Sequence, residues 1–160
     1  MPRSHLMEKG RTTLTNVTRL PRRDDRDNIT APDTVTPAEL KSLLGWLGLP
    51  REWFAERCKV SRRQVIRWED GDTPISETAS AEIVRIWNEA TAKIIDIVNT
   101  STTKQGSSPD GVITLRTYRV DDDCTNTGYP ATYHRALVCR AMDHLLMRTR
   151  YRVQILWAEA

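Results

Sequence analysis

The chain has 160 residues, of which 39% are hydrophobic and 28% are charged, and its formal net charge at pH 7 is +3. This length has room for one ordinary domain or for a small domain with an accessory piece, and the apolar fraction is enough to bury a core. Three scattered cysteines without a CxxC pair exclude a disulfide framework, and no apolar run approaches the length of a membrane span. We therefore expect a cytoplasmic protein.

Residues 1–35 contain seven Lys or Arg residues and five acidic residues, and they show no apolar periodicity. Such a segment cannot bury enough apolar surface to fold alone, so we predict a flexible, arginine-containing tail. Its arginines favour contact with a polyanion such as DNA, whereas the interspersed aspartates favour a plain solvated tail. Both interpretations stay open at this stage.

Residues 36–99 carry the signals of four to five consecutive helices. Thr36 and Glu39 form a capping box around a proline at the first helical position, and a leucine stripe then runs to Gly48. A second helix is predicted over residues 50–60, where a proline again opens the helix. After a third helix, Ser76 can cap a long fourth helix, or two helices in sequence, with an apolar stripe that ends near residue 98.

The third helix, VSRRQVIRWEDG, is the most informative segment of the chain. Ser61 is a good N-cap and Gly71 a good stop signal, while Val65 and Trp68 share the face that would be buried. From Arg57 to Arg67 there are five basic residues and no acidic ones. A basic face on a short capped helix is the electrostatic footprint of a DNA-binding element, although a solvated helix face is the plainer interpretation.

We expect the start of this helix to lie in the major groove of DNA. Arg62 and Arg63 would be closest to the base edges, with Arg63 as the main reader of guanine, and Arg67 would lie one turn further on. Gln64 can pair with adenine or face a phosphate, while Ser61 and Lys59 would hold phosphates. The predicted DNA-binding residues are Lys59, Ser61, Arg62, Arg63, Gln64 and Arg67.

This region resembles the lambda-repressor-like (Cro, or XRE) helix-turn-helix family over residues 36–99. The resemblance is carried by a small residue in the second helix, a turn residue, a cap, a core pair and a closing acid-x-glycine, which here are Ala55, Val60, Ser61, Val65, Trp68, Glu69 and Gly71. The family implies an all-helical domain that binds DNA.

The C-terminal part shows a different pattern. Residues 100–111 are rich in Ser, Thr and Gly and predict a linker. Strand patterns over residues 112–120 and 151–157 flank a helix that Pro130 opens. We predict an α+β protein with a strand-helix-strand unit at residues 112–160, and because two strands are marginal alone, this unit would complete its core by dimerisation.

This order of parts is similar to a group of phage and bacterial autoregulators that includes the anti-CRISPR-associated repressors. The similarity implies a homodimer that binds an inverted repeat in its own promoter and represses transcription. The tail of residues 1–35 and the terminal strand depart from that pattern and leave the subunit geometry open.

Other functions find less support. We see no nucleotide-binding glycine loop or zinc-hydrolase signature, so we expect no enzyme, no cofactor and no metal. The main alternative is an antitoxin-like or other protein-binding module in which DNA or RNA binding is secondary. Our interpretation is a sequence-specific, nucleoid-associated transcriptional repressor that acts as a homodimer on double-stranded DNA.

Overall fold

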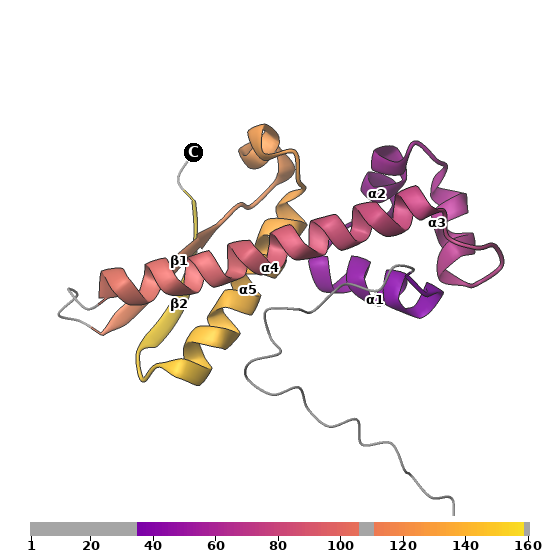
Figure 1. Cartoon of the computed structure of the whole chain (residues 1–160). Helices are drawn as coiled ribbons and strands as arrows, with labels where there is room; N and C mark the ends of the chain where they lie inside the picture. The colour runs from indigo at the N-terminus through magenta and orange to yellow at the C-terminus, as the bar shows by residue number, and fades with distance from the viewer. Residues whose placement is uncertain (1–34, 106–110, 159–160) are drawn as a thin grey trace, which may run out of the picture. The chain divides into compact units, whose positions relative to one another are not determined.

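The computed structural model describes residues 35–105 and 111–158, which form a mostly helical fold with a small parallel sheet (Figure 1). This mixed helix and strand content agrees with the predicted α+β class. In chain order the elements are α1 (Pro37–Leu47), α2 (Arg51–Cys58), α3 (Arg62–Glu69), α4 (Glu77–Gln105), β1 (Val112–Thr117), η2 (Asp121–Thr127), α5 (Ala131–Arg148) and β2 (Arg152–Trp157).

The predicted capping signals of α1 are confirmed. The Thr36 hydroxyl accepts a hydrogen bond from the Glu39 amide at 3.2 Å, and the Glu39 carboxylate accepts one from the Thr36 amide at 2.8 Å. The helix ends at Gly48, whose φ of 65° lies in the left-handed region. The same local chemistry begins α4, where the Ser76 hydroxyl accepts from the amide of Ala79 at 3.2 Å.

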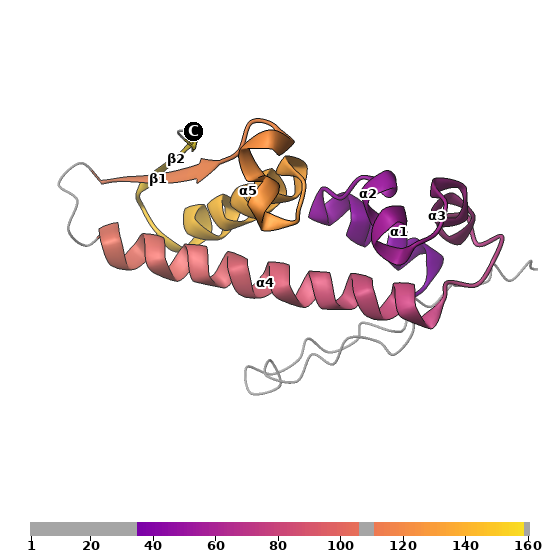
Figure 2. The ribbon, with the colours of Figure 1, turned by 90° about the horizontal axis from the view of Figure 1, so that it is seen from above.

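Helix α4 is one continuous helix of 29 residues. It packs against the N-terminal helices and also against α5 and β1. Figures 1 and 2 show α1, α2 and α3 beside its N-terminal part, and α5 with the two strands beside its C-terminal part. The prediction of a linker at residues 100–111 was wrong for residues 100–105, which are helical. The hydroxyls of Thr102 and Thr103 donate to carbonyls one turn earlier, which satisfies these polar side chains within a helix.

The strand-helix-strand order is confirmed. Strands β1 and β2 pair in parallel, with Ile113 opposite Val153 and Leu115 opposite Ile155, and α5 makes the crossover between them. Ile113 and Leu115 are buried beneath the helices, at 1% and 4% exposure. The apolar face of β1 therefore belongs to the core of the protein.

One hydrophobic core contains buried side chains from α1, α2, α3, α4, α5 and β1, and Val153 and Ile155 of β2 pack against it. The expected division at the linker into a helical domain and a separate strand-helix-strand unit therefore does not correspond to two separate cores. Val35 also belongs to this core, since it is 6% exposed, whereas the rest of the predicted tail lies outside the described residues. Among the described helices, none has the length and apolar character required to cross a membrane.

Candidate nucleic-acid interface

Helices α2 and α3 are joined by a tight three-residue turn. Lys59 ends α2 in the left-handed conformation, with φ of 56°, and the Val60 amide donates back to the Ala55 carbonyl at 2.9 Å. The Ser61 hydroxyl then accepts from the Gln64 amide at 3.2 Å, which confirms Ser61 as the N-cap of α3. Two consecutive caps thus fix the angle at which α3 leaves α2.

Helix α3 has one buried face and one exposed face. Val65 and Trp68 are 0% and 3% exposed, which confirms the predicted core pair, and Gly71 follows the helix with φ of 80°. Arg63 and Arg67 are exposed on the other side, and no ion pair or side-chain hydrogen bond holds either of them within residues 35–105 and 111–158. Helix α3 therefore presents to solvent two guanidinium groups that have no partner among the described residues.

Arg62 is exposed as well, but it forms an ion pair with Glu52 at the start of α2. The pKa of Glu52 lies below its ordinary value because its own backbone amide donates to the carboxylate and because Arg62 and Arg51 lie nearby. Both side chains are more than half exposed, so the pair adds little stability. An approaching phosphate would compete with Glu52 for this guanidinium.

Two more of the predicted DNA-binding residues have partners within the protein. The Gln64 side-chain amide donates to the Thr73 hydroxyl at 3.0 Å and is half-buried, so it ties α3 to the loop that follows. The hydroxyl of Ser61 is engaged as the cap. Lys59 is exposed at the turn, on the same stretch of chain as the free arginines. The six residues therefore lie together, and their exposed, unpaired cations are Lys59, Arg63 and Arg67.

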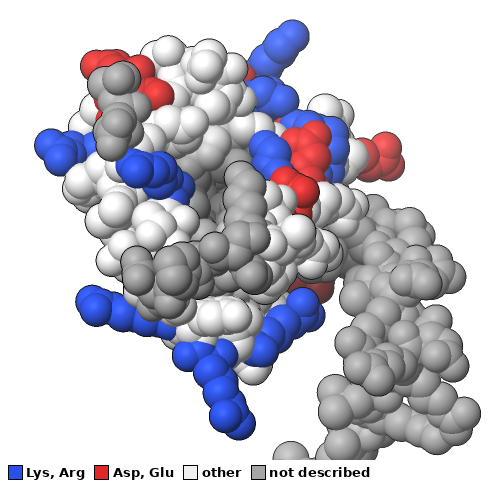
Figure 3. All heavy atoms as spheres, turned by 90° about the vertical axis from the view of Figure 1, so that its left-hand side faces the viewer, with Lys and Arg blue, Asp and Glu red and all other residues white. Residues whose placement is uncertain are grey.

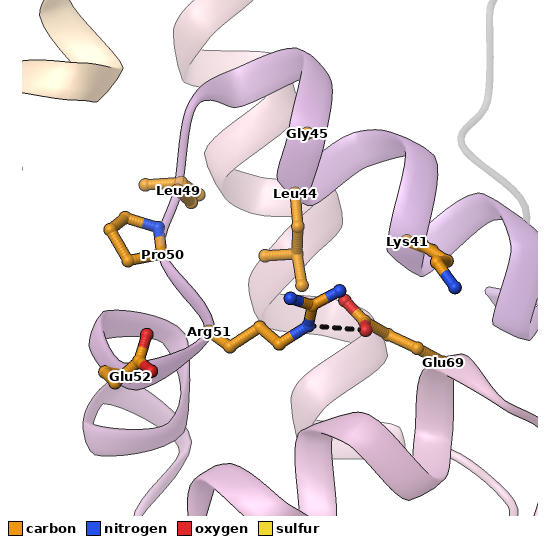
Figure 4. Close-up of a pocket in the computed structure, with 8 residues that line it drawn as sticks. All are labelled: Lys41, Leu44, Gly45, Leu49, Pro50, Arg51, Glu52 and Glu69. Carbon is orange, nitrogen blue, oxygen red and sulfur yellow. Dashed lines mark hydrogen bonds and ion pairs between the residues drawn. The ribbon is translucent and has the colours of Figure 1, made fainter.

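A partly buried ion pair anchors the end of α3. Arg51 at the start of α2 donates to Glu69 at 2.6 Å, and the Glu69 side chain is only 3% exposed. Figure 4 shows this pair at the wall of a pocket of about 240 Å³, with Leu44 and Lys41 of α1 on the opposite side. Removing Arg51 would leave the buried Glu69 carboxylate without its partner, so the pair helps to hold α2 and α3 in one orientation.

Arg57 belongs to the basic run in the sequence, but it holds the structure together. Its guanidinium donates to Glu82 of α4 at 2.7 Å and lies 5.7 Å from the centre of the Trp53 ring. Hydrogen bonds from Arg85 and Arg57 hold the pKa of Glu82 at about 2, well below its ordinary value of 4.5. Arg57 is thus a clamp between α2 and α4.

An aromatic cluster joins the same face of α2 to the C-terminal elements. Trp53 stacks on Tyr129 with ring centres 5.3 Å apart, and Tyr129 stacks on Tyr133 at 4.3 Å. The Tyr129 hydroxyl donates to Glu89 at 2.8 Å, and burial together with this carboxylate raises the pKa of Tyr129. The cluster has no signal in the sequence, because its members come from distant segments with no shared local pattern.

No protein-family model matches this chain, and no curated protein matches it either. Among the residues that the structure describes, no group of His, Cys, Asp or Glu side chains is arranged to hold a metal ion. The features of the described residues that bear on function are the geometry and charge of the α2 to α3 region.

Proposed function

We propose that this protein is a sequence-specific DNA-binding repressor of the helix-turn-helix type, acting as a homodimer on an inverted repeat in its own promoter. The observation that carries the proposal is the division of α3 into two faces, with Val65 and Trp68 buried while Arg63 and Arg67 are exposed without partners. A helix of this kind can enter a major groove without losing its own packing.

The arginines supply the chemistry of recognition. A guanidinium can donate two parallel hydrogen bonds to O6 and N7 of guanine, so Arg63 near the start of α3 is the proposed base reader. Arg67 follows one turn later, and Arg62 would add a phosphate contact once it leaves Glu52. Lys59 and the first amides of α3 would also face phosphates.

The experiment is a fluorescence-anisotropy titration of the full chain against DNA upstream of its own gene, with shuffled DNA as competitor. We expect Arg63→Ala to weaken specific binding by about 1–3 kcal/mol, which is roughly 5- to 150-fold in Kd, and to change binding to shuffled DNA little. Arg150→Ala is the charge-matched control, because Arg150 is also exposed but lies between α5 and β2.

Two results would contradict the proposal. Equal losses for Arg63→Ala and Arg150→Ala would mean that only net charge matters. Weak binding of the unmodified chain that is equal on both DNAs and disappears with salt would make DNA a secondary ligand.

A protein-binding role of the antitoxin kind is the second candidate. It is favoured by exposed apolar side chains at the end of α5, where Leu146 is 52% and Met147 is 85% exposed. Leu146→Lys with Met147→Lys would abolish capture of such a partner, whereas the repressor proposal expects specific DNA binding by this variant to persist.

A further inference from the structure

The two edges of the small sheet differ. Residues 114–116 of β1 line a pocket of about 290 Å³ together with α4, so this helix lies along the edge of β1. Strand β2 has no strand neighbour on its other side within the described residues. An open edge on a two-stranded sheet is a template for a further strand, and a sheet this small is marginal alone.

The direction of the backbone groups on β2 follows from its bonds to β1. The amides of Arg152 and Ala158, at the two ends of the strand, donate toward the β1 side at 3.1 and 2.8 Å. Because successive residues of a strand alternate in direction, the even-numbered residues face β1 and the odd-numbered ones face the open edge. The outward-pointing amide and carbonyl groups therefore belong to Val153, Ile155 and Trp157, and of these the Trp157 carbonyl already accepts a hydrogen bond from the Arg116 side chain at 3.1 Å.

Apolar side chains lie exposed along the same strand. Leu156 and Trp157 are 44% and 46% exposed, and Val153 and Ile155 are only half-buried, in contrast with their fully buried counterparts on β1. In Figure 3, Lys and Arg side chains project from the rim of one side of the molecule, and white atoms of residues that are neither basic nor acidic lie between them. The open edge of β2 thus combines five backbone groups that have no partner among the described residues with incompletely covered apolar side chains.

We propose that β2 pairs antiparallel with β2 of a second copy of this chain, about a two-fold axis at Ile155. The result is a four-stranded sheet in the order β1, β2, β2, β1. In this register Ile155 lies opposite its own copy, and Val153 lies opposite the second copy's Trp157. The five outward-pointing groups that lack a partner then gain one in each strand, and the Trp157 carbonyl, which accepts from Arg116, accepts a second hydrogen bond with its other lone pair.

Symmetry and charge favour a second copy as the occupant. A two-fold axis perpendicular to the sheet and centred on a residue keeps the odd-numbered side chains of both strands on the same face of the sheet. A one-residue slip would put the odd-numbered side chains of the two strands on opposite faces. Three exposed arginines lie between the end of α5 and the start of β2, and they are Arg148, Arg150 and Arg152. Antiparallel pairing puts the two Arg152 Cα atoms about 20 Å apart at opposite ends of the ribbon, which limits their repulsion.

The biological role of this dimer rests on the proposed function, but its existence is measured without DNA. The background for the test is the full chain with Cys139→Ser, because Cys139 is an exposed thiol that would give unrelated disulfides. In the proposed register Gln154 lies opposite the second copy's Leu156 in a non-hydrogen-bonded pair, where the Cα atoms are about 4.5 Å apart. That separation is within the range of a disulfide.

We expect Gln154→Cys with Leu156→Cys to form an intermolecular disulfide in most chains under mild oxidation, seen as a doubled mass on a non-reducing gel. Each single variant should stay largely uncross-linked, because identical positions in this register are separated diagonally by more than a disulfide allows. Cross-linking of Gln154→Cys alone would overturn the register, since it requires an axis at Gln154. Equal, low cross-linking of all three variants would overturn the pairing.

Sedimentation of the unmodified chain gives an independent measurement. We expect twice the mass of one chain at micromolar concentrations, and a monomer at 50 μM would overturn the proposal. Ile155→Pro removes an amide that points outward, so we expect at least a tenfold weaker dimer with the fold retained. Gln154→Pro is the matched control, because it removes an amide that faces β1 and should lower the melting temperature more.

The same variants separate this inference from the proposed function. If cross-linking fails while the chain binds its promoter specifically, the β2 pairing is wrong and the repressor proposal stands. If cross-linking succeeds while no DNA sequence is preferred, the pairing stands and the repressor proposal fails.

Discussion

Gly48 is the position where a single methyl group should disturb the fold most clearly. It ends α1 in the left-handed region, and a Cβ placed there would lie 2.5 Å from the Thr132 carbonyl oxygen and 3.2 Å from the Cβ of Ala136. Both neighbours belong to α5. Gly48→Ala therefore has two costs, one in backbone conformation and one in the packing of α1 against α5.

Each cost can be given a magnitude. The left-handed conformation costs a residue with a Cβ about 1–2 kcal/mol, and forcing a methyl group against a packed helix backbone costs about 1–3 kcal/mol. We expect Gly48→Ala to lower the free energy of unfolding by about 2–5 kcal/mol and the melting temperature by about 5–15 °C. Against a total stability of about 5–15 kcal/mol, this is a large change.

Gly45 provides a matched control on the same helix. It lies within α1, and a Cβ added there would meet nothing within 4 Å. Gly45→Ala should raise the free energy of unfolding by about 0.5–1 kcal/mol, because alanine is the better helix former. Urea denaturation of both variants, followed by circular dichroism, measures the difference. A loss below 1 kcal/mol for Gly48→Ala, or equal losses for the two variants, would refute this reasoning.

Two further stability predictions follow from the turn and from α4. Lys59→Gly should raise the free energy of unfolding by about 1 kcal/mol, since Lys59 adopts φ of 56°, and an unchanged or lower urea midpoint would contradict this. The pKa of Glu82 is lowered from 4.5 to about 2, so its ion pairs contribute stability that is present above pH 4.5 and is lost as the pH falls toward 2. Since the arginine partners are about 40% exposed, we expect a loss of about 1–2 kcal/mol in melts between pH 5 and pH 2.5. Glu82→Gln should lack this part of the acid sensitivity, and an identical pH dependence would argue against it.

The local signals in the sequence predicted the elements well. Thr36, Ser61 and Ser76 cap the helices that they were expected to cap, and Gly48 and Gly71 have the positive φ values that a helix stop favours. The strand-helix-strand order was also confirmed. The caps and stop signals depend on residues within about one turn of each other, so they can be predicted from residues that are neighbours in the sequence.

Whether a basic residue is held in an ion pair or is free on the surface depends on contacts between segments that are distant in the sequence. Arg57 and Arg63 look alike in the sequence, yet Arg57 is held by Glu82 while Arg63 is free on the surface. The linker prediction failed for the same reason, since the polar residues 100–105 extend α4 in a protein where this helix also packs against β1.

The sequence by itself determined where α1, α3 and α4 begin, the strand-helix-strand order of the C-terminal part, and that one helix carries a concentrated positive charge. Only the tertiary structure decided which cations are free and that one core unites both halves. It also decided that β2 has an open edge. Hydrogen-bond caps and apolar periodicity act over a few residues, whereas ion pairs, ring stacking and strand neighbours depend on distances that exist only after the chain has folded.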